Sequence, residues 1–220
     1  MENKNLNAEN ELQYQYELVC KKNNDMTPYG PILHYIGTNV SSVIEMGIGP
    51  LSLGLNSTWC LLQGLYESPF TGDKKFISYD ILEDPININI YDAQKVAIEL
   101  GIDFKFMIAD SGTVIIDKAD LLFIDTEHTY QHLIKELRLH SPKIEKYILI
   151  HDTSAPYGNW EDWPFNHERR GELANSPEKY GLWPAVVDFL QENKEWKLNK
   201  RYEHNHGLTI IERVSNENNL

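Results

Sequence analysis

Residues 43–65 read VIEMGIGPLSLGLNSTWCLLQGL, and this stretch decides the fold class. It begins as an apolar strand, passes through Gly47 and Gly49, and continues from Ser57 with apolar residues at helical spacing. A glycine-bearing turn between a strand and a helix can cradle a phosphate, an adenosine or nothing at all. The residues that the rest of the chain places beside Glu45 must therefore decide between these three readings.

Strand-like and helix-like segments alternate along most of the chain. We predict a leading helix over 12–22 after a frayed segment 1–11, and a helix over 57–67 that Ser57 caps. The other predicted helices are 90–101, 129–140 and 181–193, and the predicted parallel strands are 42–47, 75–80, 103–110, 120–126 and 146–153. Apolar strands that alternate with helices favour a parallel sheet covered by helices on both faces.

Two further strand-like segments follow the last helix, EWKLNKRYEH at 195–204 and GLTIIERV at 207–214. Only Asn205 and His206 separate them, which is too few residues for a parallel crossover. They must therefore form an antiparallel hairpin. The fold class is α/β and Rossmann-like, with a mostly parallel sheet and one reversed strand at its end.

Length and composition narrow the class of protein. A chain of 220 residues suits one compact domain, and a net charge of −13 disfavours nucleic acid and membrane surfaces as partners. The polar start MENKNLNAENELQ does not match a signal peptide, and no apolar stretch is long enough to span a bilayer, so we expect a cytoplasmic protein. The two cysteines, Cys20 and Cys60, exclude a disulfide framework, and Cys60 is expected to be a buried reduced thiol.

Each predicted parallel strand carries an acidic residue at or near its carboxyl end: Glu45, Asp80, Asp110, Asp125 and Asp152. Ligands of open α/β sheets bind at this edge. One such acid is usually a helix cap or a turn former, but five of them predict a functional rim. Asp80 follows the second strand beside the glycine turn of the first, which is the arrangement that binds the hydroxyls of an adenosine ribose.

The turn lacks the dinucleotide fingerprint G-x-G-x-x-G, because Gly47, Gly49 and Gly54 are spaced G-x-G-x-x-x-x-G. A pyrophosphate ligand is therefore disfavoured. A ligand with an adenosine and no phosphates, such as S-adenosylmethionine, needs only close backbone approach at the glycines and a carboxylate for its ribose. The alternative is that the glycines serve the turn alone.

Several segments resemble, in order, those of class I S-adenosylmethionine-dependent methyltransferases: VIEMGIG, STWCLLQGL, FISYDI, LLFIDTEHTYQHLIKEL, KYILIHDT and GLWPAVVDFLQENKEW with NHGLTIIER. More narrowly, they resemble cephalosporin hydroxylase-like proteins and metal-dependent macrolide-sugar O-methyltransferases. The resemblance covers residues 32–214. It implies the seven-strand methyltransferase sheet, with an N-terminal extension at 1–30 and a methyltransferase domain at 31–215.

The same resemblance implies a role for individual residues. It places at the cofactor Glu45, Gly47, Gly49, Ser57, Asp80, Ile81, Asp110 and Ser111. It implies a divalent metal, Mg²⁺ or Mn²⁺, on Asp125 and Asp152, and makes His128 the general base beside Asp125. His151 stands where several relatives have a carboxylate, so it is either a further metal ligand or a core histidine. For His128 the alternative is a backbone-bonded histidine at a helix start.

Residues 154–181 form a long predicted loop rich in aromatic residues, with Arg169 and Arg170. Such a loop is typical of a lid over a sugar or aromatic acceptor, and a homo-oligomer contact is the alternative. We predict O-methylation of a small hydroxylated acceptor, a sugar or a natural product. Two other functions stay open: a nucleotide-binding or scaffolding module whose chemistry has lapsed, and an NAD-dependent oxidoreductase, which the missing fingerprint disfavours.

Overall fold

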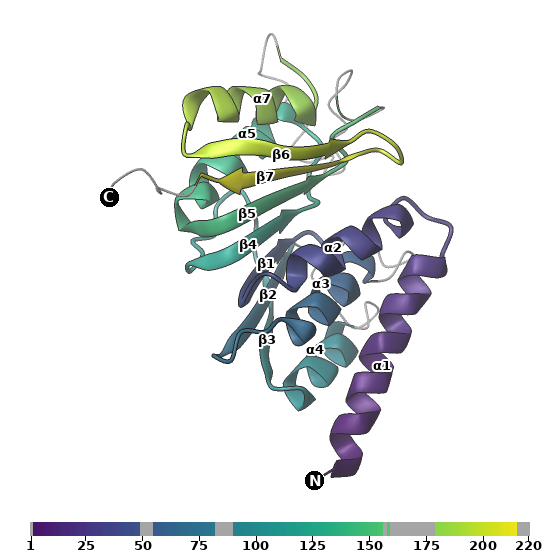
Figure 1. Cartoon of the computed structure of the whole chain (residues 1–220). Helices are drawn as coiled ribbons and strands as arrows, with labels where there is room; N and C mark the ends of the chain where they lie inside the picture. The colour runs from purple at the N-terminus through teal and green to yellow at the C-terminus, as the bar shows by residue number, and fades with distance from the viewer. Residues whose placement is uncertain (1, 49–54, 82–89, 156–157, 159–178, 215–220) are drawn as a thin grey trace. The chain divides into compact units, whose positions relative to one another are not determined.

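The computed structural model describes residues 2–48, 55–81, 90–155, 158 and 179–214. Its seven strands form one sheet in the order β3-β2-β1-β4-β5-β7-β6 (Figure 1). The strands are β1 (Ser42–Met46), β2 (Lys74–Asp80), β3 (Ile102–Ile108), β4 (Ala119–Ile124), β5 (Ile144–His151), β6 (Trp196–Tyr202) and β7 (Leu208–Arg213). The helices are α1 (Glu2–Lys21), α2 (Gly30–Gly37), α3 (Asn56–Glu67), α4 (Ile90–Glu99), α5 (Tyr130–His140) and α7 (Leu182–Glu192), with short 3₁₀ helices η1 (Thr27–Tyr29) and η3 (Ser141–Lys143).

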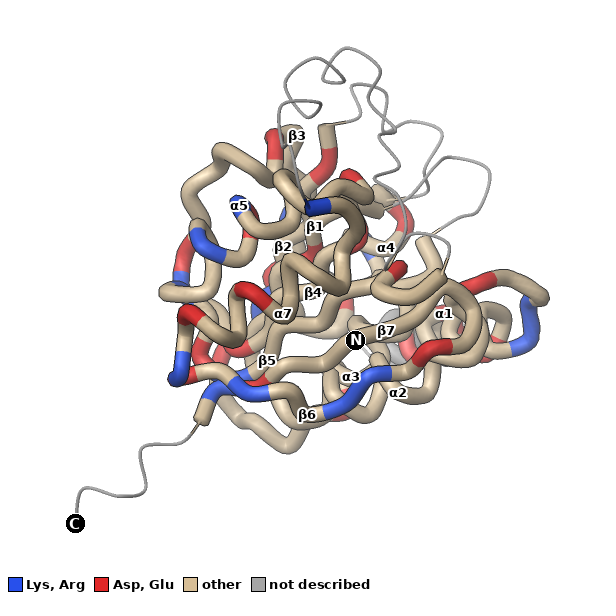
Figure 2. Tube along the Cα trace, turned by 90° about the horizontal axis from the view of Figure 1, so that it is seen from above, with Lys and Arg blue, Asp and Glu red and all other residues tan. Residues whose placement is uncertain are grey.

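The pairing of the strands confirms the predicted fold class. Strand β2 pairs in parallel with β1 and β3, whereas β7 runs antiparallel to both β5 and β6. The reversed strand was predicted at the end of the sheet, but it lies between β5 and β6. Residues 208–211 of β7 are buried, whereas β6 exposes residues 197–200 and carries basic side chains along its length (Figure 2). A charged strand suits an edge because it discourages pairing with another chain.

The chain forms two compact units. The first comprises residues 1–111 and 119–122, and the second comprises residues 112–118 and 123–220. Within the first unit, α1 packs on α3 and α4, and α2 packs on α3 (Figure 1). Within the second, α5 packs on α7. The domain boundary at residue 30 stays a prediction.

The N-terminal region is more helical than predicted. Helix α1 begins at Glu2 and not at residue 12, because Ala8 and Leu12 are buried at helical spacing against the rest of the unit. Helix α2 was not predicted. It begins with Pro31 in its first turn, and the apolar run that follows buries Leu33 and Ile36. None of the described helices is both long and apolar enough to cross a membrane.

Helix α3 begins differently from the prediction. Leu55 is its N-cap residue and makes no side-chain capping bond, so the predicted cap at Ser57 is wrong. Ser57 lies within the first turn of α3, and its hydroxyl donates to Glu45. A capping hydroxyl accepts from a backbone N–H, whereas the Ser57 hydroxyl donates to a buried carboxylate, which is a stronger, charge-assisted hydrogen bond. Helix α5 does have a side-chain cap, because Thr129 Oγ1 accepts from the His132 N–H.

Candidate functional site

The glycine turn after β1 is tied to the end of β2. Gly47 has a φ of +81°, a conformation that favours glycine, and its N–H donates to the Tyr79 carbonyl at 2.9 Å. The next N–H, that of Ile48, donates to Asp80 Oδ2 at 2.9 Å. Asp80 therefore holds the start of the turn against the carboxyl end of β2. Gly49 lies outside the described residues.

The end of β3 lies at the same edge of the first unit. The N–H of Ala109 donates to the Asp80 carbonyl at 2.9 Å, and Asp110 and Ser111 follow directly. Ile81, next to Asp80, is an exposed apolar side chain at 49% exposure. An apolar side chain beside converging polar groups is typical of a ligand site. The structure thus brings Gly47, Asp80 and Ile81 to one edge with the segment that carries Asp110 and Ser111.

Glu45 lies behind this turn and is fully buried. Its carboxylate accepts hydrogen bonds from three hydroxyls: Ser57 at 2.7 Å, Thr58 at 2.8 Å, and Ser78. These bonds join β1 to β2 and to the first turn of α3. We predicted Glu45 and Ser57 as cofactor contacts; in the structure they bond to each other and support the turn from within the protein.

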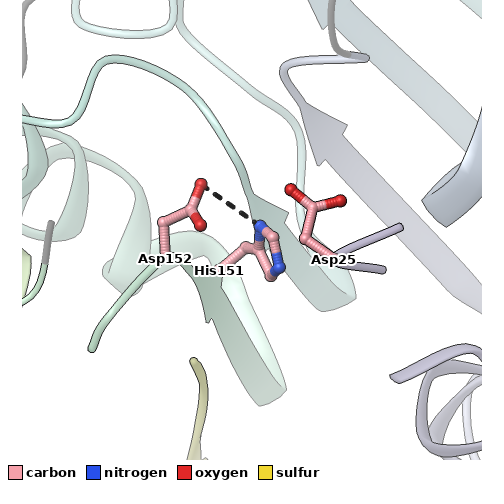
Figure 3. Close-up of side chains that lie close together, drawn as sticks. All are labelled: Asp25, His151 and Asp152. Atoms are coloured by element: carbon pink, nitrogen blue, oxygen red, sulfur yellow. Dashed lines mark ion pairs between the residues drawn. The ribbon is translucent and has the colours of Figure 1, made fainter. Parts of the chain in front are cut away.

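The second unit gathers four ionisable side chains, which we call the Asp-His cluster: Asp125, His128, His151 and Asp152. Asp125 follows β4 and Asp152 follows β5. His128 Nε2 lies 2.9 Å from Asp152 Oδ2 and 3.7 Å from Asp125 Oδ1. His151 Nδ1 lies 3.3 Å from Asp152 Oδ2, as Figure 3 shows, and 3.4 Å from Asp125 Oδ2. The cluster brings together every metal and catalytic residue that we predicted.

The charges of this cluster compensate one another. Burial by itself would lower the pKa of His128, but hydrogen bonds and charge from Asp125 and Asp152 raise that pKa to about 9. The pKa of His151 is likewise held well above its usual value against burial, chiefly by the charge of Asp125. Burial opposes ionisation of Asp125 and Asp152 too, yet the charge of His151 keeps the pKa of each carboxyl below its ordinary value.

This balance makes two neighbouring carboxylates compatible with burial. Two adjacent carboxylates repel each other unless a positive charge or a shared proton lies between them. In the structure, His128 and His151 supply the positive charge.

Two neighbours of the cluster were not predicted as site residues. His206, in the turn between β6 and β7, has its Nδ1 3.4 Å from Asp152 Oδ1. Glu136 is fully buried on α5 and accepts from the Thr126 hydroxyl at 2.8 and 3.0 Å, which anchors the residue next to Asp125. Periodicity in the sequence does not single out either residue, and the one sequence signal near His206 is the short connection between β6 and β7.

The cluster also offers a set of metal ligands. Asp125, His128 and Asp152 each present one ligand atom, and these atoms lie within 4.8 Å of one another. Carboxylate oxygens with one imidazole suit Mn²⁺ or another transition metal better than Mg²⁺. Most of the predicted lid, residues 159–178 with Arg169 and Arg170, lies outside the described residues.

No protein-family model matches this chain, and no curated protein matches it either. Solved structures share its fold at low sequence identity. A methyltransferase from Podospora anserina bound to S-adenosylhomocysteine (SAH) is 13% identical with a TM-score of 0.55, over 93% of this chain and 88% of that one. An O-methyltransferase from Bacillus cereus in complex with SAH is 14% identical with a TM-score of 0.55, over 94% and 91%.

Magnesium protoporphyrin IX methyltransferase from Synechocystis PCC 6803, also with bound SAH, is 11% identical with a TM-score of 0.54, over 91% of this chain and 93% of that one. The chain therefore has the Rossmann-like fold of S-adenosylmethionine-dependent methyltransferases. The narrower resemblance to cephalosporin hydroxylase-like proteins stays a prediction.

Proposed function

We propose that this protein is an S-adenosylmethionine-dependent methyltransferase that methylates a hydroxyl group of a small molecule. The observation that carries the proposal is the sheet, whose order and reversed β7 belong to a fold found with bound SAH in the similar structures. The local geometry at the carboxyl ends of β1 and β2 supports it. A fold hosts many functions, so the residues at this edge must supply the rest of the argument.

The first unit has residues suited to the cofactor. Gly47 lets the backbone come close to a ligand, and the carboxylate of Asp80 would accept hydrogen bonds from the ribose hydroxyls. Ile81 would offer an apolar surface to the adenine, with Asp110 and Ser111 at its edge. When bound, S-adenosylmethionine supplies an electrophilic methyl group on a sulfonium ion.

The second unit has residues suited to the acceptor. A hydroxyl must lose its proton when it attacks a methyl group, and we assign that proton to His128. Asp152, at 2.9 Å from His128 Nε2, would orient the imidazole and stabilise its protonated form. Asp125 and Asp152 would also hold a divalent cation, whose chemistry is to lower the pKa of a hydroxyl and to offset the carboxylate charges. Those charges raise the pKa of His128, so a cation would favour its neutral form.

Calorimetry with SAH and with NAD⁺ tests the proposed function without a known acceptor. We expect SAH to bind and NAD⁺ to give no heat at millimolar concentration, because the pyrophosphate fingerprint is absent. Tighter binding of NAD⁺ than of SAH would support the oxidoreductase alternative. Binding of SAH without methyl transfer to any of a broad panel of hydroxylated molecules would support a lapsed module.

Asp80→Ala is expected to weaken SAH binding about ten- to a hundredfold. The change removes charge-assisted hydrogen bonds to the ribose that contribute roughly 1.5–3 kcal/mol. Asp80→Asn should weaken binding less, because its amide oxygen still accepts from the Ile48 N–H. Asp103→Ala, which removes an exposed acid from β3, is the matched control. Full affinity in a folded Asp80→Ala variant would place the cofactor elsewhere.

Chelation of divalent metal is expected to abolish methyl transfer and to leave SAH affinity nearly unchanged, because the proposed cofactor and metal residues come from different strands. In the apo protein, Mn²⁺ should bind at millimolar concentration or below. Asp125→Asn and Asp152→Asn should each weaken it at least tenfold. If neither Mg²⁺ nor Mn²⁺ binds at millimolar concentration, with or without SAH, the metal assignment is wrong.

A further inference from the structure

The two cysteines lie together where three helices of the first unit meet. Cys20 is on α1, Cys60 is on α3, and Gly30 begins α2. A Cβ atom added to Gly30 would lie 3.0 Å from Cys20 Sγ and 3.3 Å from Cys60 Sγ, so both sulfurs pack against this glycine. Both thiols are reduced. Neither thiol has a part in the proposed methyl transfer.

From this geometry we propose that Cys20 and Cys60 are a peroxide-sensitive thiol pair that closes to a disulfide between α1 and α3. Cys20 is partly exposed and is the thiol that meets the oxidant, whereas Cys60 is fully buried beside the same glycine. A reactive thiol with a second thiol in contact is the arrangement of a redox-responsive cysteine.

The surroundings of the two thiols shift their pKa values in opposite directions. The neighbouring Cys60 lowers the pKa of Cys20 to about 6 against the effect of burial, and Tyr16 and the charge of His34 act in the same direction. Burial raises the pKa of Cys60 well above its usual value. These opposite directions favour the thiolate at Cys20 and the thiol at Cys60. The ring centres of Tyr16 and His34 lie 4.9 Å apart, and His34 Nε2 lies 2.7 Å from Glu67 Oε2.

The reaction takes two steps. The Cys20 thiolate attacks one oxygen of hydrogen peroxide, the O–O bond breaks, and the leaving hydroxide takes up a proton to form water, which leaves a sulfenic acid on Cys20. Cys60 then attacks the sulfenic sulfur, the S–O bond breaks, and the departing hydroxide takes the Cys60 proton. Two thiols and one peroxide thus give one disulfide and two waters, and an added dithiol reverses the change.

Peptide mass spectrometry on the wild-type protein tests the proposal. One equivalent of hydrogen peroxide should convert both thiols within one chain to a disulfide that links the peptides of Cys20 and Cys60, and dithiothreitol should restore them. In the Cys60→Ser variant a sulfenic acid should instead accumulate at Cys20, where dimedone should trap it. Cys20→Ser should leave Cys60 unmodified, because that thiol is buried. Tyr16→Phe, which removes a hydroxyl that acts to lower the pKa of Cys20, should slow alkylation of Cys20 by iodoacetamide several-fold.

Two results would overturn the proposal. In one, the wild-type protein keeps two free thiols although the same peroxide treatment oxidises glutathione added to the sample. In the other, Cys60 of the Cys20→Ser variant is oxidised as fast as the first thiol of the wild-type protein. Neither readout depends on methyl transfer, and the wild-type measurement needs no variant to fold.

Discussion

Methyl transfer by a His128→Ala variant is expected to fall by about 10²–10⁴-fold, the usual contribution of a positioned general base. The change also removes one of the imidazoles beside Asp125 and Asp152, and leaves His151 beside both carboxylates and His206 beside Asp152. The measurement is transfer of a labelled methyl group from S-adenosylmethionine to whichever hydroxylated acceptor shows turnover with the wild type. SAH affinity should stay within about twofold, because the proposed cofactor contacts come from β1, β2 and β3.

The control for this variant is His204→Ala, which removes an exposed histidine from the same unit and should leave the rate unchanged. Added imidazole should restore part of the lost rate in His128→Ala, since a diffusible base can enter the space that the side chain leaves. A structural role for His128 would not respond to imidazole. If the variant keeps more than a tenth of the wild-type rate, the proton goes to another group.

Gly64→Ala is expected to lower the free energy of unfolding by about 3 kcal/mol, at the upper end for overpacking a core. The added Cβ would lie 2.2 Å from the His34 carbonyl oxygen and 2.8 Å from Gly37 Cα, both of which are backbone atoms of α2. Alanine stabilises a helix by about 1 kcal/mol relative to glycine, so the free-energy cost of the clash must exceed that gain. Urea unfolding measures the change, and the melting temperature should fall by roughly 6–12 °C.

Gly72→Ala is the matched control, because an added Cβ there has no atom within 4 Å and should leave stability nearly unchanged. Gly37→Ala should destabilise less than Gly64→Ala, since its Cβ would lie 3.0 Å from Gly64 Cα and 3.1 Å from the Leu61 carbonyl oxygen. Equal stability of Gly64→Ala and Gly72→Ala would show that α2 and α3 can move apart at little cost.

Local pattern was enough to predict the sheet and its class. Apolar runs that end in or before an acid mark β1, β2, β4 and β5 in the sequence. Strands β1, β4 and β5 are buried along most of their length, and β2 is buried at Phe76, Ser78 and Tyr79. The hairpin of β6 and β7 followed from the few residues between its strands. The predictions failed where burial outweighs local preference: α1 starts ten residues earlier than predicted, and α2 (Gly30–Gly37) was not predicted.

The sequence likewise predicted some residues of the candidate site and missed others. Asp80, Asp125 and Asp152 could be predicted because strand ends in a parallel sheet share one edge, which is a property of topology and not of side-chain packing. The side chains that pair with these acids could not be predicted from the sequence. His206 reaches Asp152 through a turn in which Asn205, His206 and Gly207 all have positive φ, and a sequence pattern does not specify that geometry.

The sequence by itself therefore determined the strands and most of the helices, that the last two strands form an antiparallel hairpin, and that acids lie at or directly after the ends of the parallel strands. Only the tertiary structure decided which groups bind those carboxylates and compensate their charge. It pairs Asp152 with His128 and His151, engages Glu45 with three hydroxyls, and packs Cys20 and Cys60 against Gly30. The physical reason is that strand and helix patterns arise between residues close in the chain, whereas ionisation and thiol reactivity depend on the groups that folding places within a few ångströms.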